Sequence, residues 1–222
     1  MRKLLWISSK TTSNLGPKPQ TFIARAISCD KRKRYPAHQL LENTVIDLRD
    51  YLTISAFDKD SFVKLRRFVL FNHRAVNIGF TKIETKYIGQ IFSPRITFVR
   101  IHGSQIDFPT LVKTVPYATY FSFISDLPKG WEKVLLNFKS KSMGPFFLTP
   151  KEITDFDSLH KFLTRQIPKF FLYLTDERNK FRTRKFYRYF QRELISGPKL
   201  RIDYKTKNGK DVSVKYSPKI LT

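Results

Sequence analysis

The chain has 222 residues, with 42 Lys and Arg against 18 Asp and Glu and a formal net charge of +24. This excess favours a polyanionic partner, while the 41% hydrophobic content excludes a purely disordered basic tail. The longest apolar runs, such as 170–174, are much shorter than the roughly 18–20 residues of a membrane span. The single cysteine, Cys29, excludes a disulfide scaffold and a cysteine-based zinc site.

The positive charge is concentrated toward both ends of the chain. Residues 1–35 carry nine basic residues and one acid, residues 36–140 carry 14 and nine, and residues 141–222 carry 19 and eight. This distribution predicts a moderately charged core between two basic extensions. We therefore divide the chain into a basic N-terminal arm (1–46), a core domain (47–142) and a basic C-terminal extension (143–222).

The N-terminal segment is rich in basic residues, Ser and Thr, a composition that is typical of a mitochondrial transit peptide. Its Pro and Gly residues argue against a self-contained fold, so we interpret it as an extended arm held by a partner; the alternative is a solvated tail. The residues of this arm predicted to contact phosphate are Arg2, Lys3, Lys10, Lys18, Arg25, Lys31, Arg32, Lys33 and Arg34.

Hydrophobic spacing predicts six elements in the core. In chain order they are strand 47–57, helix 59–77, strand 80–91, strand 95–101, helix 108–126 and strand 131–138. Asp58 and Asp107 are the expected N-caps of the two helices, and Pro116 breaks or kinks the second. This order predicts an α+β fold with a ferredoxin-like split βαβ core, in which two helices cover one face of a four-stranded antiparallel sheet.

The C-terminal extension is expected to combine helices with a β-hairpin. A capping box at 149–152 predicts a helix to about residue 165, and 175–177 predicts the start of a second helix that ends near Ser196. Asn208-Gly209 between two alternating runs predicts a hairpin over 200–217. The sequence shows no internal repeat.

No catalytic constellation is recognisable in the sequence. It contains no glycine-rich phosphate-binding motif, and its four histidines are scattered without metal-ligand spacing. Strand alternation and helix capping account for the aspartates between residues 47 and 60 more simply than a metal site does. We therefore expect no enzyme activity, cofactor, metal or small-molecule substrate.

The segment 178–192 interleaves basic and aromatic residues. Its predicted RNA contacts are Arg178, Lys180, Arg182, Arg184, Lys185, Arg188 and Arg192. Arginine can grip phosphate with two hydrogen bonds and stack on bases, and aromatic rings can stack on unpaired bases. We expect Phe181, Phe186 and Phe190 to lie in the core. RNA is favoured over duplex DNA because no DNA-reading motif occurs.

Two short motifs resemble the small-subunit ribosomal protein S-ten family. Ala56-Phe57-Asp58 matches the end of the family's first strand, and the run from Arg95 to Arg100 is similar to its Arg-Phe-Thr-Val-x-Arg motif, with Ile101-His102-Gly103 in place of Ser-Pro-His. The resemblance covers about 90 residues. It implies a ferredoxin-like domain and a structural ribosomal role, with Arg95 and Arg100 near RNA; a mitochondrial large-subunit protein with the same fold is the alternative.

Taken together, these observations predict a structural constituent of an organellar, mitochondrial-matrix ribosome that binds ribosomal RNA and neighbouring ribosomal proteins. The abundance of Phe, Lys and Ile favours an organelle-encoded protein. One alternative is an organellar RNA-processing enzyme or its accessory RNA-binding subunit. Another is a peripheral subunit of an inner-membrane complex that contacts anionic lipid without spanning the bilayer.

Overall fold

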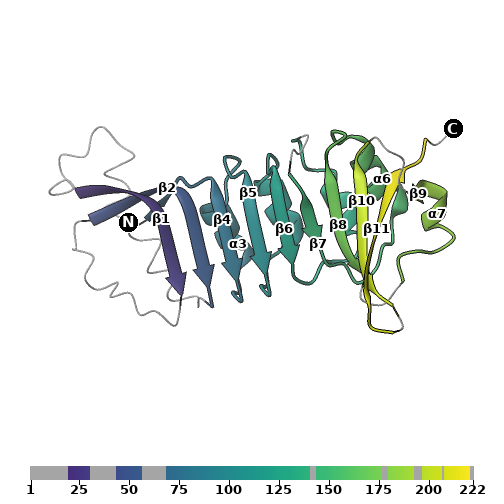
Figure 1. Cartoon of the computed structure of the whole chain (residues 1–222). Coiled ribbons are helices and arrows are strands. Elements are labelled where there is room, and N and C mark those ends of the chain that lie inside the picture. Colours follow the sequence, from purple (N-terminus) through teal and green to yellow (C-terminus); the bar gives the residue numbers. More distant parts are fainter. Residues whose placement is uncertain are drawn as a thin grey trace.

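A single, mostly parallel sheet organises the molecule. The computed structural model describes residues 20–30, 44–56, 69–140, 144–176, 180–192, 197–206 and 208–220. Within these ranges, eleven strands form one sheet in the order β1-β2-β4-β5-β6-β7-β8-β10-β11-β9, and β3 also pairs with β2. Figure 1 views this sheet from the side that carries no helices.

The elements alternate along most of the chain. The strands are β1 (Gln20–Asp30), β2 (Thr44–Ser55), β3 (Val69–Phe71), β4 (Ala75–Gly79), β5 (Phe98–His102), β6 (Tyr120–Ile124), β7 (Phe146–Leu148), β8 (Phe171–Asp176), β9 (Phe190–Arg192), β10 (Lys199–Lys205) and β11 (Asp211–Pro218). The described helices are α3 (Thr85–Ile91), α4 (Phe108–Thr114), α5 (Trp131–Leu135), α6 (Phe156–Thr164) and α7 (Phe186–Tyr189).

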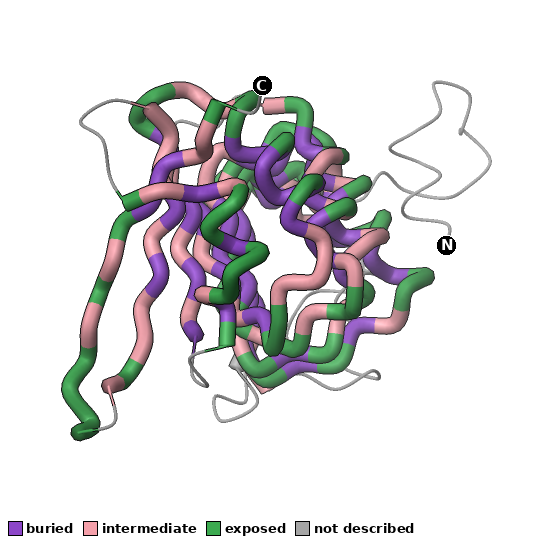
Figure 2. The backbone as a smooth tube through the Cα atoms, turned by 90° about the vertical axis from the view of Figure 1, so that its right-hand side faces the viewer, coloured by how far each residue is buried: buried purple, intermediate pink, exposed green. Residues whose placement is uncertain are grey.

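From β4 to β8 the fold is a solenoid of strand–helix units. Each parallel strand is followed by a short helix that returns the chain to the edge where the next strand begins, and α3 to α6 cover the same face of the sheet (Figures 1 and 2). Residues in register on successive strands from β4 to β10, such as Val76 and Val99, lie 22 to 28 residues apart. Such units stack because each leaves an apolar face that only its neighbours cover.

The core lies between the sheet and the helices. Alternate residues of each strand face this layer and form two rows that are at most 1% exposed. The first row is Leu52, Val76, Val99, Phe121, Phe146, Leu172 and Leu200, and the second is Ile54, Ile78, Ile101, Phe123, Leu148, Leu174 and Ile202. Burial of these side chains is the main stabilising contribution to the solenoid.

Hydroxyl groups connect the turns at the edge where the parallel strands end. The backbone N–H of Thr81 donates to Ser104 Oγ at 3.1 Å, and the N–H of Ser104 donates to Ser125 Oγ at 2.9 Å. Each hydroxyl thus satisfies a backbone donor of the preceding turn, which an interior position would otherwise leave without a partner. Successive turns are therefore held in register although the sequence has no repeat.

The prediction of a ferredoxin-like core is wrong. That fold has a four-stranded antiparallel sheet, whereas here each strand from β1 to β10 in the sheet order pairs in parallel with the next. The expected helix 59–77 contains β3 and the start of β4, and its first part lies outside the described residues. The expected strands 80–91 and 131–138 contain α3 and α5. These helices have seven and five residues, too few for helical spacing to be separated from strand alternation.

Other core predictions are confirmed. Strand 47–57 corresponds to β2 and strand 95–101 to β5. Asp107 caps α4 by accepting a hydrogen bond from the N–H of Thr110 at 2.9 Å. The expected helix 108–126 ends at Thr114, just before Pro116, and its remainder contains β6. Proline lacks the N–H that would continue the helix.

In the C-terminal region, the hairpin is confirmed and one helix is wrong. β10 and β11 pair antiparallel around Asn208-Gly209, and Gly209 has a φ of 74°. A helix is present before residue 165, but it begins at Phe156 with Asp155 as its cap, and β7 precedes it. The expected helix 175–196 is replaced by the end of β8, the short α7 and β9.

Candidate nucleic-acid interface

The helix-free face of the sheet displays aromatic side chains. Strand alternation directs one set of residues toward the helices and the other set toward this face. We define the aromatic band as the six half-buried outward rings Tyr51, Phe98, Tyr120, Phe147, Phe171 and Tyr173. They come from β2, β5, β6, β7 and β8, so the band crosses most of the sheet.

Ring contacts make the band continuous. The rings of Phe98 and Tyr120 stack with centroids 4.3 Å apart, and those of Phe147 and Tyr173 stack at 4.5 Å. Tyr51 leans over the small Ala75 of β4 to within 6.3 Å of Phe98. Tyr120 lies 5.8 Å from Phe147 and so joins the two stacked pairs.

Cationic side chains lie on the same face. The guanidinium carbon of Arg201 lies 5.2 Å from the centroid of the Tyr173 ring, and the Lys199 ammonium lies 5.9 Å from that of Phe171. Arg100 is exposed and lies in register with Ser122, beside the stacked Phe98–Tyr120 pair. The face therefore offers both ring surfaces and positive charge.

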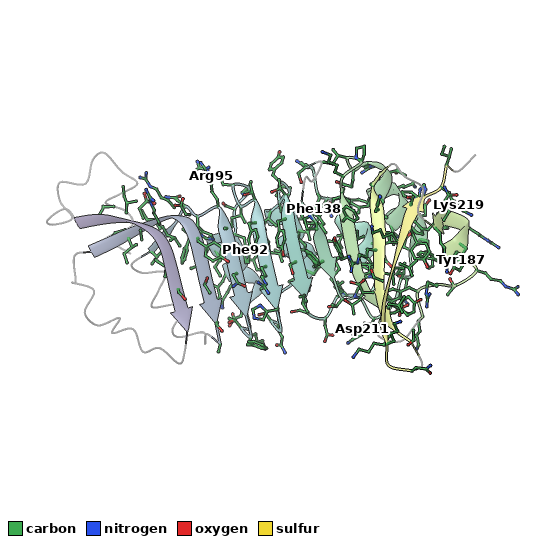
Figure 3. All side chains as sticks on the ribbon, in the orientation of Figure 1. Phe92, Arg95, Phe138, Tyr187, Asp211 and Lys219 are labelled. Carbon is green, nitrogen blue, oxygen red and sulfur yellow. The ribbon has the colours of Figure 1, made fainter. Side chains whose placement is uncertain are left out.

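A second feature, the basic edge, borders this face where the parallel strands begin. The described loops at this edge from β4 to β11 are 72–75, 92–98, 115–120, 136–140, 144–145, 164–171, 197–199 and 217–220. We define the basic edge as their seven cations: Arg74, Arg95, Lys139, Arg165, Lys169, Lys199 and Lys219. These described loops contain no Asp or Glu. Figure 3 shows Arg95 and Lys219 toward opposite ends of this edge.

Helix C-termini account for only part of the basic edge. Cations are favoured in the last turn of a helix, where backbone carbonyls carry partial negative charge. The basic residues in the last turns of α4, α5 and α6 are Lys113, Lys133 and Lys161, and α3 has none. Arg165 is the C-cap residue of α6, and the Lys219 ammonium donates to the backbone carbonyl of Tyr187 in α7 at 2.7 Å. The other five cations of the basic edge lie outside these turns, so helix dipoles give no reason for their charge.

The opposite edge of the sheet is different, because several of its carboxylates have structural roles. Asp107 and Asp155 cap α4 and α6 by accepting backbone hydrogen bonds. Asp176 accepts from the N–H groups of Lys180 and Phe181 at 2.9 and 3.0 Å. Acids are favoured there because each helix begins at this edge, where its N–H groups need acceptors.

Only part of the predicted RNA-contact set lies at this interface. Arg95 belongs to the basic edge, and Arg100 lies on the helix-free face. Arg25 is exposed on β1. Outside the described residues lie Arg2, Lys3, Lys10, Lys18, Lys31, Arg32, Lys33, Arg34 and Arg178.

The basic segment 180–192 lies at the C-terminal end of the solenoid. Its rings Phe181, Phe186 and Phe190 are buried, as predicted. The Arg182 guanidinium carbon lies 3.7 Å from the centroid of the Tyr204 ring, and Lys185 approaches the ring of Phe156 on α6. The exposed cations of this segment are Lys180, Arg184, Lys185, Arg188 and Arg192.

The sequence interpretation missed the aromatic band. Its signal was present in runs such as 95–101, 119–124 and 170–174, where aromatic or aliphatic residues occupy both faces of a strand instead of alternating with polar ones. Such a run predicts either a strand covered on both faces or an outward apolar surface. The band became recognisable only when the parallel register placed these outward rings next to one another.

The described part of the chain contains neither a candidate metal centre nor a candidate membrane span. Among its residues, no three His, Cys, Asp or Glu side chains gather as metal ligands would. No helix in the described ranges is both long and apolar enough to cross a membrane. The sequence and the structure were also compared with known proteins: no protein-family model, no curated protein and no solved structure matches this chain.

Proposed function

We propose that this protein is a non-catalytic RNA-binding scaffold that contacts phosphate groups along the basic edge. The observation that carries the proposal is the presence of seven cations and no carboxylate in the described loops of that edge. Aligned cations repel one another, and a polyanion relieves this repulsion while releasing its own counterions. Solvation alone gives no reason for the segregation of charge between the two edges.

The shape of the sheet favours RNA over duplex DNA. Duplex DNA is read mainly by a helix or a two-stranded ribbon inserted into the major groove. The helix-free face is a broad surface with rings and cations, and its helices lie on the other side (Figure 2). Surfaces of this kind suit RNA segments whose bases and phosphates are both accessible.

Two narrower predictions remain open within this proposal. A role in a mitochondrial ribosome is supported by the net charge of +24, but no longer by a ferredoxin-like fold. The accessory subunit of an RNA-processing enzyme would use the same surface. Both predict binding along the basic edge, and they differ in the complex with which the native protein sediments.

The test compares two variants, each of which lacks three cations at one of the two edges. One variant carries Arg95→Ala, Lys139→Ala and Lys169→Ala, all exposed residues of the basic edge. The matched control carries Lys82→Ala, Lys129→Ala and Lys151→Ala, which are exposed at the opposite edge. Both variants lose three positive charges, so a general effect of net charge would alter them equally.

The measurement is the affinity of the full chain for RNA as a function of salt concentration. For the basic-edge variant, the slope of log K against log salt should become shallower by about 2, since each lost contact to a single strand contributes about 0.7. The control variant should keep the wild-type slope. Equal slopes for both variants, or binding to anionic vesicles but not to RNA, would contradict the proposal.

A further inference from the structure

The aromatic band and the basic edge lie side by side in a way that resembles the two sides of a nucleotide strand. Tyr51 is close to the start of the parallel pairing of β2 with β4, and Phe98, Tyr120 and Phe171 are the first residues of their strands. These rings therefore lie next to the loops that carry the basic edge. A polynucleotide likewise carries a row of phosphates beside a row of bases.

Each ring of the aromatic band keeps part of its surface exposed on the helix-free face, because it is only half-buried. Within each pair, Phe98 with Tyr120 and Phe147 with Tyr173, the planes are inclined by 6° and 19°. Between the pairs, the rings of Tyr120 and Phe147 are tilted by 47° with their centroids 5.8 Å apart, which is too close for a base to enter between them. Unpaired bases would therefore pack on the parts of the rings that remain exposed on the helix-free face.

We propose that the helix-free face binds single-stranded RNA, with unpaired bases stacked on the aromatic band and phosphates on the basic edge. This inference rests on the proposed RNA-binding function and specifies its substrate class. In a duplex the base faces are covered by neighbouring base pairs, so they cannot reach the rings. Base–aromatic stacking tolerates any sequence, because every base has a π-face.

The direction of the bound strand follows from the arrangement of the sheet. The band crosses six neighbouring strands, from β2 to β8, which at about 4.8 Å per strand extends over roughly 24 Å. The RNA would run across the β-strands, because both rows do so. Arg100, Lys199 and Arg201 on the same face would reinforce the contact by stacking or by pairing with phosphate.

The aromatic contacts also stabilise the sheet, because cross-strand ring pairs contribute to strand pairing. The test must therefore separate binding from folding. Replacing Phe147 and Tyr173 together by Leu keeps apolar volume between the strands and removes the π-faces. The control is Phe80→Leu, since Phe80 is 68% exposed but lies at the opposite edge of the sheet.

The experiment measures fluorescence anisotropy of the full chain with a labelled oligouridylate of about 12 nucleotides, within the range of known single-strand sites, and with an RNA hairpin duplex. We expect the single strand to bind at least about 10-fold more tightly than the duplex. The Phe147→Leu, Tyr173→Leu variant should lose about 10-fold for the single strand, with an unchanged salt slope. Phe80→Leu should bind as the wild type does.

The outcomes distinguish this inference from the proposed function. If duplex and single strand bind equally, or if the Leu variant binds as the wild type does, the single-strand inference is wrong while RNA binding stands. If neither RNA binds, the proposed function fails as well. If the Leu variant does not fold, ultraviolet crosslinking of the wild type to oligouridylate decides: crosslinks should map to β5–β8, and crosslinks confined to other segments would overturn the inference.

Discussion

The two edges of the sheet carry charged residues for different reasons. At the edge where strands end, carboxylates cap helices and loops, and hydroxyls connect successive turns. At the edge where strands begin, the described loops from β4 to β11 carry only positive charge. The first arrangement is explained by the hydrogen-bonding needs of helix N-termini, whereas most cations of the second have no such explanation within the fold.

This contrast is the reason for proposing the basic edge as a binding surface. Each turn needs acceptors where its helix begins, so acids at that edge say little about partners. Five of the seven cations of the basic edge have no such role at a helix end; the exceptions are Arg165, the C-cap of α6, and Lys219, which donates to the carbonyl of Tyr187. A net charge of +24 therefore becomes informative only once the structural charges have been separated from the others.

The largest expected effect concerns the structural edge. Glu132 is fully buried, and its Oε1 accepts hydrogen bonds from the N–H groups of Thr154 and Asp155 at 2.6 and 3.2 Å. Glu132→Ala removes the acceptor of both donors and should lower the free energy of unfolding by about 4 kcal/mol, because each lost bond to a charged group contributes about 2 kcal/mol. Urea denaturation of the variant measures this loss.

The matched control for this prediction is Glu152→Ala. Glu152 is exposed, and the bond from the Trp131 indole N–H at 3.0 Å reaches its backbone carbonyl, which the substitution retains. We expect a change below about 0.5 kcal/mol. Equal losses for the two variants would show that the carboxylates at this edge do not have the separate roles assigned to them.

A smaller effect is expected at His73, which precedes β4 at the basic edge. Its side chain is buried against the ring of Phe71. Among the described residues neither ring nitrogen meets a hydrogen-bond partner. Desolvation by burial lowers the pKa of His73 from 6.5 to about 4. The unfolded chain therefore takes up the proton first as the pH falls, so stability should decrease between pH 6.5 and about 4.

The size of this decrease follows from linkage between protonation and folding. A shift from 6.5 to about 4 corresponds to a loss of at most about 3 kcal/mol, which is complete only below the pKa of the folded state. His73→Leu should show a correspondingly flatter stability profile in this window, measured by urea denaturation at a series of pH values. Parallel profiles for the two proteins would mean that His73 titrates normally and that the basic edge tolerates the charge of a protonated His73.

The fold could be predicted only in part, for physical reasons. The hairpin at Asn208-Gly209 was predictable because its turn chemistry is local, and so were β2 and β5. The short helices α3 and α5 were mistaken for strands because one or two turns contain too few buried residues to define a period. Parallel order depends on contacts between residues more than twenty positions apart, and no sequence repeat indicated it.

The candidate site illustrates the same limit. Arg95 and Arg100 were found from a motif resemblance whose implied fold is wrong, although both residues lie at the candidate interface. The rings of Phe147 and Tyr173 come from separate units, and only the register of β7 with β8 brings them together. Net charge led to the proposed class of partner, but the location of the candidate surface depends on the solenoid.

The most direct test of the contrast between the edges is amide hydrogen exchange of the full chain with and without oligouridylate. We predict that binding slows exchange in loops 92–98 and 164–171 of the basic edge, and leaves exchange unchanged in loops 80–84, 103–107 and 125–130 at the opposite edge. Protection of the loops at the opposite edge, without protection of the loops at the basic edge, would contradict the central claim that the basic edge is the RNA-binding surface.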